Sequence, residues 1–149
     1  MDRRRTLGKL TQLDTVQRLQ LADARLSLAD AMDGLRIAGE RTCASVRELQ
    51  LSETEFDGIL SAISFDPDAL RRAAHAIMIA EKKVTERREI EDLARQAERD
   101  KRTGWHQQRS RLSAIERQRR NVERKLAQIR EDRAAIDALA LAAERERGS

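Results

Sequence analysis

A heptad repeat of apolar residues runs through almost the whole chain and constrains its fold more than any other feature. With Leu7 at position a and Leu10 at position d, twelve of the seventeen a and d positions up to Ile63 are apolar. A second apolar run with the same spacing begins after Pro67, the only proline. Sustained spacing of this kind is typical of supercoiled helices and not of a globular core.

The segment around Pro67 divides the repeat into two helices. Asp66 is a suitable N-cap, and Pro67 and Asp68 suit the first turn of the helix that follows. We expect a first helix over about residues 6–61, a break at 62–67 and a second helix over about 68–145. A short connection makes neighbouring helices antiparallel. The predicted fold is all-α, a single domain (1–149) that forms a long antiparallel two-helix coiled-coil hairpin.

The apolar layers also predict a register. Pairing Ile63 with Leu70 gives facing a positions whose numbers sum to 133. In this register the polar exceptions meet, because Asp14 faces Arg119, and such a pair fixes a register more than it stabilises a fold. The remaining layers are Phe56–Ile77, Leu49–Val84, Leu28–Trp105, Leu21–Leu112 and Leu7–Leu126.

The middle of the repeat, residues 34–45 and 87–101, is weaker. Thr42 and Ser45 would face Glu91 and Arg87, and Glu98 and Lys101 also occupy seam positions. Three apolar residues, Ile90, Leu93 and Ala97, lie one residue out of the heptad frame. They indicate that the apolar stripe shifts locally and returns to the frame by Trp105.

The same register leaves the end of the second helix without a partner. Residues from about 130 onward extend past Leu7 and form a C-terminal helical overhang of roughly 30 Å. An apolar stripe continues along it, and a lone amphipathic helix of this length is marginally stable. The stripe, which includes Ile136, Leu139, Ala140 and Ala143, is therefore the best candidate for a binding surface.

Composition argues against catalysis and against a membrane span. The chain has no apolar run of the length that crosses a bilayer, and its N-terminus lacks the apolar core of a signal peptide. It also lacks phosphate-binding loops and zinc-ligand spacing, and His75 and His106 lie far apart. The single cysteine, Cys43, excludes an internal disulfide and favours a reducing compartment. We expect no enzyme, no cofactor, no metal site and no small-molecule ligand.

Positive charge is concentrated in residues 101–130, where ten basic residues stand against Glu116 and Glu123, a balance of +8. A solvated helix face, an acidic protein partner and nucleic acid all fit this stretch. The alternatives to a specific protein partner are a nucleic-acid-associated coiled coil, which we favour less, and a generic scaffold protein.

Three segments and the position of the break carry a resemblance to a known family. The segment Ile77–Val84, which contains Glu81 and Lys82, is similar to I-x-x-L-E-K-x-I. The segment Trp105–Leu112 resembles W-x-x-x-K-x-R-L, and Ile136–Ala140 resembles a closing M-D-E-x-A. With the break near residue 65 and the longer helix second, the chain resembles the flagellar export protein FliJ and its type III secretion relative YscO.

The resemblance implies a role in bacterial flagellum biogenesis and motility, or in type III secretion. Family members are cytoplasmic, peripheral to the inner membrane, and act as a stalk-like rod between a hexameric export ATPase and the cytoplasmic part of a membrane export gate, with export chaperones as further partners. The resemblance implies an ATPase-binding end and a gate side, the latter with Glu81 and Lys82. The register and the break assign structural roles to Trp105, Asp14, Arg119 and Pro67. The ATPase end comprises Leu7, Leu10, Arg109, Arg111, Ile136, Leu139 and Ala143.

The predicted register is open to a crosslinking test. Cysteines placed at Leu28 and Trp105 should form a disulfide within one chain under mild oxidation, because these positions share a layer. Non-reducing gel electrophoresis measures the product. Crosslinks that form only between chains would instead indicate a parallel dimer.

Overall fold

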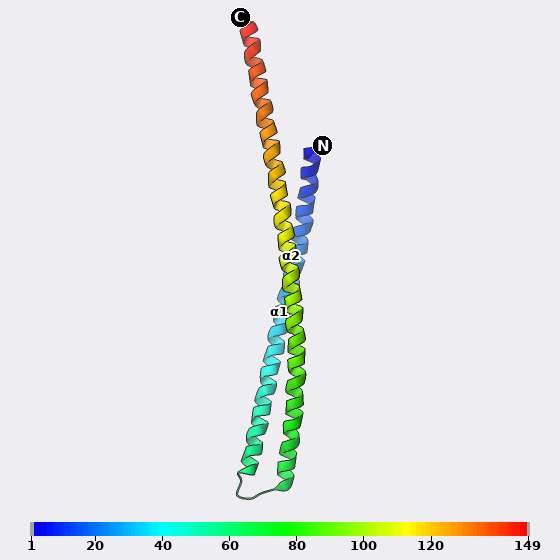
Figure 1. Cartoon of the computed structure of the whole chain (residues 1–149), viewed down its shortest axis with the longest axis vertical. Helices are drawn as coiled ribbons and strands as arrows, with labels where there is room; N and C mark the ends of the chain where they lie inside the picture. The colour runs from blue at the N-terminus through cyan, green and yellow to red at the C-terminus, as the bar shows by residue number, and fades with distance from the viewer. Residues whose placement is uncertain (1, 149) are drawn as a thin grey trace. The chain divides into compact units, whose positions relative to one another are not determined.

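A computed structural model describes residues 2–148 and contains two helices. Helix α1 spans Arg3–Leu60 and helix α2 spans Pro67–Arg147, with no strand among the described residues. The chain reverses between them, so the helices run antiparallel (Figure 1). The predicted fold class, an all-α antiparallel two-helix hairpin, is confirmed. Both helices begin slightly earlier than expected, and α2 continues two residues beyond the expected 145.

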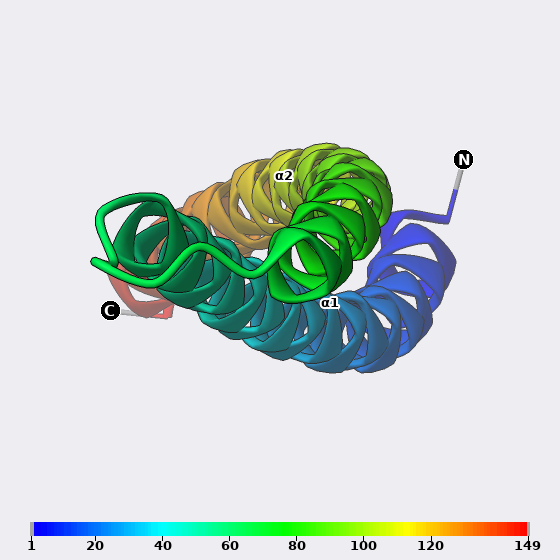
Figure 2. The ribbon, with the colours of Figure 1, turned by 90° about the horizontal axis from the view of Figure 1, so that it is seen from below.

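The chain divides into two compact units, each built from a stretch of both helices. Unit 1 comprises the chain up to Ala24 and the chain from Trp105 on. Unit 2 comprises Arg25–Gly104 and includes the connection between the helices, which lies in front in Figure 2. In each unit a stretch of α1 packs against a stretch of α2.

The break is defined by local hydrogen bonds. The backbone N–H of Ala62 donates to the carbonyl of Ile59 at 3.3 Å, a tightened last turn that ends α1. The backbone N–H of Asp68 donates to Asp66 Oδ1 at 3.0 Å, so Asp66 caps α2 as predicted. Ile63 lies between the helices and is fully exposed. Its predicted pairing with Leu70 is wrong, because the heptad geometry ends where α1 ends.

The heptad frame predicted from the sequence is the packing frame of the structure. Every a and d position from Leu7 to Ile59 is buried or half-buried. The same holds on α2 from Leu70 to Ile129, except for Lys101, which is exposed. No described side chain is enclosed completely, because each helix segment has only one neighbouring helix in its unit.

The predicted shift of the apolar stripe in the middle of α2 is wrong. Ile90 and Leu93 are exposed, and Glu98 stays in the seam, where it is buried. Arg102 Nε donates to Glu98 Oε1 at 2.8 Å from one turn further along the same helix. This local ion pair neutralises the buried carboxylate, so the helix keeps its frame and leaves the apolar side chains outside.

Comparison of two leucines on α2 tests this frame. Leu112 is only 8% exposed, whereas Leu93 is 72% exposed. Leu112→Ala should lower the free energy of unfolding by about 2–3 kcal/mol, since it removes buried methyl groups. Leu93→Ala, the matched control, should change it by less than about 0.5 kcal/mol. Urea denaturation followed by circular dichroism measures both, and equal losses would contradict the frame.

Candidate functional site

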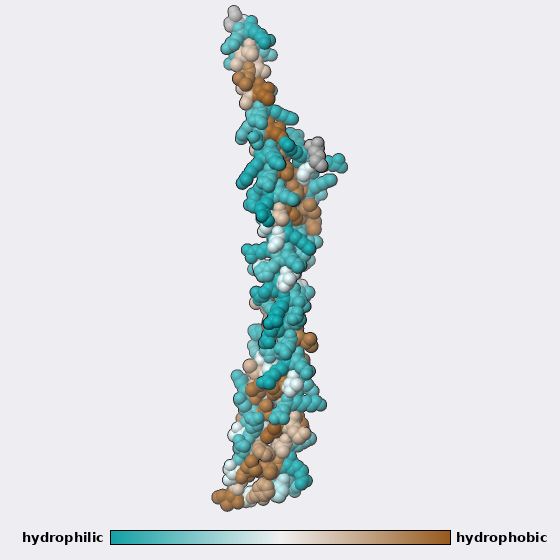
Figure 3. Space-filling model, in the orientation of Figure 1, coloured by the Kyte–Doolittle hydropathy of each residue, from teal (hydrophilic) through white to brown (hydrophobic). Residues whose placement is uncertain are grey.

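The last turns of α2 form an exposed helical overhang in unit 1. All described residues from Arg130 onward are exposed. Ile136 is 63% exposed and Leu139 is 71% exposed, and with Ala140 and Ala143 they follow the i, i+3, i+4, i+7 spacing of one helix face. Figure 3 shows apolar surface near this end of the molecule. We name Ile136, Leu139, Ala140 and Ala143 the overhang face.

The other residues predicted for the ATPase end lie in two different environments. Leu10 is buried and Leu7 is half-buried, so both belong to the seam and offer little surface to a partner. Arg109 and Arg111 are exposed. The guanidinium carbon of Arg109 lies 5.4 Å from the centre of the Trp105 ring, a cation–π distance. Trp105 also meets the ring of His106 edge to face, with centroids 4.9 Å apart.

Many arginines of α2 in unit 1 carry charge that no carboxylate balances. Among the described residues, Arg111, Arg120 and Arg124 are exposed and take part in no ion pair. Arg117 contacts only a backbone carbonyl, that of Ser113, at 3.4 Å. Most of the predicted basic stretch therefore lies in unit 1 and presents unbalanced positive charge on its surface.

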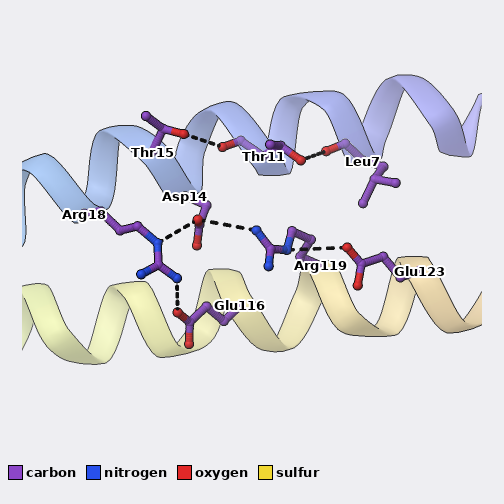
Figure 4. A network of polar contacts seen from close by, with 8 residues as sticks. All are labelled: Leu7, Thr11, Asp14, Thr15, Arg18, Glu116, Arg119 and Glu123. Atoms are coloured by element: carbon purple, nitrogen blue, oxygen red, sulfur yellow. Dashed lines mark hydrogen bonds and ion pairs between the residues drawn. The ribbon is translucent and has the colours of Figure 1, made fainter.

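A polar network holds α1 and α2 together in this unit (Figure 4). Asp14, at a seam position of α1, is only 6% exposed. Its Oδ2 accepts a hydrogen bond from Arg119 of α2 at 3.4 Å and one from Arg18 of α1 at 2.9 Å. Arg18 also donates to Glu116 Oε1 at 2.8 Å, a second link between the helices. The predicted pairing of Asp14 with Arg119 is confirmed.

The network affects the pKa of Arg18 and leaves part of its hydrogen-bonding capacity unused. The hydrogen bond from Arg18 to Asp14 raises the pKa of Arg18 above its ordinary value. Asp14 Oδ1 and Arg119 Nε are buried and have no hydrogen-bond partner in the structure, although Arg119 Nε lies 3.5 Å from a Glu123 carboxylate oxygen. Because unsatisfied buried polar atoms destabilise a fold, this network specifies a pairing more than it adds stability.

A second polar contact lies next to it in the seam. Gln17 is buried, and its side-chain amide donates to the backbone carbonyl of Gln108 at 3.2 Å and to the side-chain oxygen of the same residue. Two successive seam layers of unit 1 are thus polar, and each contains a specific cross-helix hydrogen bond.

The residues predicted for the gate side lie on α2 in unit 2. Glu81 and Lys82 are exposed and take part in no ion pair among the described residues. The neighbouring Lys83 instead binds Glu48 of α1 at 2.9 Å. A shallow hollow on this side of the helix is lined by Ile79, Lys82, Lys83, Glu86, Arg87 and Ile90.

Sequence reasoning missed the apolar part of this surface. Ile79 and Ile90 are exposed, and with Ala76 and Leu93 they repeat at heptad positions c and g, outside the seam. Assigning Ile90 to the seam concealed this row. A count of apolar residues at every heptad position would have found it.

Residues 2–148 contain neither a metal-binding cluster nor a segment that could span a membrane. No group of three His, Cys, Asp or Glu side chains is placed to hold a metal ion. Neither helix, over its described length, has a segment apolar enough to cross a membrane. Cys43 is a free, exposed thiol. Comparison with known protein families, with curated proteins and with solved structures finds no match for this chain.

A double-mutant cycle at Asp14 and Arg119 tests the network. Either charge reversal, Asp14→Arg or Arg119→Asp, should destabilise the hairpin, and the double reversal should recover part of the loss. The coupling should be about 0.5–3 kcal/mol, because the carboxylate is buried. Chemical denaturation measures it. The exposed pair Arg71–Asp68, 3.9 Å apart, is the control and should show no measurable coupling. Equal coupling energies at the two pairs would contradict a buried link between Asp14 and Arg119.

Proposed function

We propose that this chain is a non-enzymatic, cytoplasmic component of a flagellar or type III protein-export apparatus. In this proposal it acts as a stalk-like coiled coil between a hexameric export ATPase and the cytoplasmic part of a membrane export gate. Unit 1 carries the ATPase-binding end and unit 2 the gate side. The tryptophan segment Trp105–Leu112 and the other similarities to the FliJ and YscO family supply the identity of the partners.

The overhang face is the observation that carries this proposal. It is an apolar row on a part of α2 where every described residue is exposed. The apolar seam residues of α2 up to Ile129 are, by contrast, at least half-buried. A ring-shaped partner with an apolar lining would cover this face. The unbalanced arginines of α2 in unit 1, including Arg109 and Arg111, would steer this unit toward acidic surfaces, an effect that salt weakens.

The proposed gate side rests on the exposed row of unit 2. Ile79 and Ile90 supply apolar contact, and Lys82 and Arg87 supply charge that no carboxylate balances in the described structure. A surface of this composition fits an acidic amphipathic segment of a partner protein. Lys82 belongs to this surface, and Glu81 precedes it in the segment that resembles the family motif.

Nucleic acid is a second candidate partner, and the unpaired arginines of unit 1 favour it. Binding to DNA would depend on Arg111, Arg120 and Arg124 and would fall steeply with salt. It would not depend on the apolar side chains of the overhang face. A generic self-associating scaffold would use that face but would bind no ATPase.

Removal of the C-terminal overhang distinguishes ATPase binding from nucleic-acid binding. A chain that ends at Arg133 should keep its two-helix packing, because the last half-buried position of α2 is Ile129. The truncated chain should lose binding to a co-expressed export ATPase and lose any stimulation of ATP hydrolysis. Pull-down and phosphate-release assays measure these losses, and circular dichroism checks the fold.

A point variant gives a sharper comparison. Ile136→Gln with Leu139→Gln should weaken ATPase binding about as much as the truncation does. Leu51→Gln, which changes an exposed leucine of unit 2, is the matched control and should have no effect. Unchanged ATPase binding by the truncated chain would reject the overhang face as the docking site. DNA binding at physiological salt without ATPase binding would favour the nucleic-acid function.

A further inference from the structure

The start of α1 and residues 126–133 of α2 line an open hollow in unit 1. Its volume is about 480 Å³, within the range of small-molecule sites. In Figures 1 and 2 the two ribbons separate toward this end of α1. On α1 the last apolar seam position toward this end is Leu7, and the next d position is Arg3.

The hollow is lined mainly by arginines from both helices. Arg3 and Arg4 come from α1, and Arg130 and Arg133 come from α2. None of these four guanidinium groups forms an ion pair with a described residue. Elsewhere some arginines pair with acids of their own helix, as Arg102 does with Glu98.

Few acidic groups are available to balance this charge. Asp2 lines the hollow, but its Oδ1 accepts a hydrogen bond from the backbone N–H of Arg4 at 3.1 Å and so caps α1. Glu131 and Asp132 are neighbours of the arginines on α2 but do not line the hollow. The half-buried side chains of Leu126 and Ile129 form the rest of its lining.

We infer that this arginine hollow binds a polyphosphate group. Guanidinium groups recognise phosphate through paired N–H donors, and four of them around one space suit a ligand with several adjacent anionic groups. A single carboxylate would leave most of this charge unbalanced, whereas a chain of two or three phosphates carries several charges within the dimensions of the hollow. The inference does not depend on the proposed export function.

The expectation that the chain binds no small molecule came from the absence of phosphate-binding loop motifs. The arginine hollow has no such motif, because its residues come from two helices and lie more than a hundred positions apart in the sequence. The phosphates could belong to a soluble polyphosphate compound or to the headgroup of a phosphorylated lipid. Both present the same chemistry to the arginines.

Titration calorimetry with inorganic tripolyphosphate tests the inference in magnesium-free buffer at about 0.15 M salt. We expect one site per chain. Arg130→Gln with Arg133→Gln should weaken binding about ten-fold or more, because charge-assisted hydrogen bonds are lost. Arg3→Gln with Arg4→Gln should have a similar effect, since both helices line the hollow. Arg88→Gln with Arg99→Gln, exposed positions of unit 2, is the control with the same change of net charge and should bind normally.

Equal weakening by the control and the hollow variants would overturn the inference, because binding would then follow net charge alone. No binding of tripolyphosphate by the intact chain would also overturn it. So would an oligoglutamate peptide that binds as tightly as tripolyphosphate and is weakened as much by the hollow variants. Circular dichroism must show unchanged helicity for each variant. A lipid source is tested by comparing binding to phosphatidylinositol bisphosphate vesicles with binding to phosphatidylserine vesicles of equal charge. Preference for the bisphosphate vesicles, with displacement by tripolyphosphate, assigns the ligand to a lipid headgroup. Absence of this preference assigns it to a soluble compound.

Discussion

The narrow seam between two helices is the interaction on which the rest of this structure depends. Each helix segment has one neighbour in its unit, so one stripe of side chains supplies nearly all the burial, and no described side chain is enclosed completely. Stability then accumulates as many small contributions from successive layers. An interface of this kind tolerates polar layers, and it leaves most of the helix surface free for partners.

Because apolar layers resemble one another, the polar layers determine which residues pair. If α2 slipped by one heptad in unit 1, Asp14 would face Leu112 or Leu126 in place of Arg119. A buried carboxylate without its cation is costly, so the slipped states are disfavoured. The unsatisfied Asp14 Oδ1 indicates that this specificity reduces the overall stability.

Sequence periodicity was sufficient for the fold class, the seam positions, the Asp66 cap and the pairing of Asp14 with Arg119. It failed at Ile63, because a repeat does not show where a helix ends. It also failed at Ile90 and Leu93, where the pattern favoured apolar residues in the seam. There the structure instead buries Glu98 beside Arg102, an ion pair within one helix that hydropathy does not register. The arginine hollow depends on how far α1 extends along α2, which only the packed structure supplies.

The exposed overhang has a thermodynamic consequence. Past Arg133 every described residue of the helix is exposed, and an isolated helical segment of that length is only marginally stable in water. A partner that covers Ile136 and Leu139 would therefore order the backbone as well as bury apolar surface. Association through this face should have a favourable enthalpy, an opposing conformational entropy and a negative heat-capacity change larger than rigid docking would give. Such a contact can be specific and still dissociate readily.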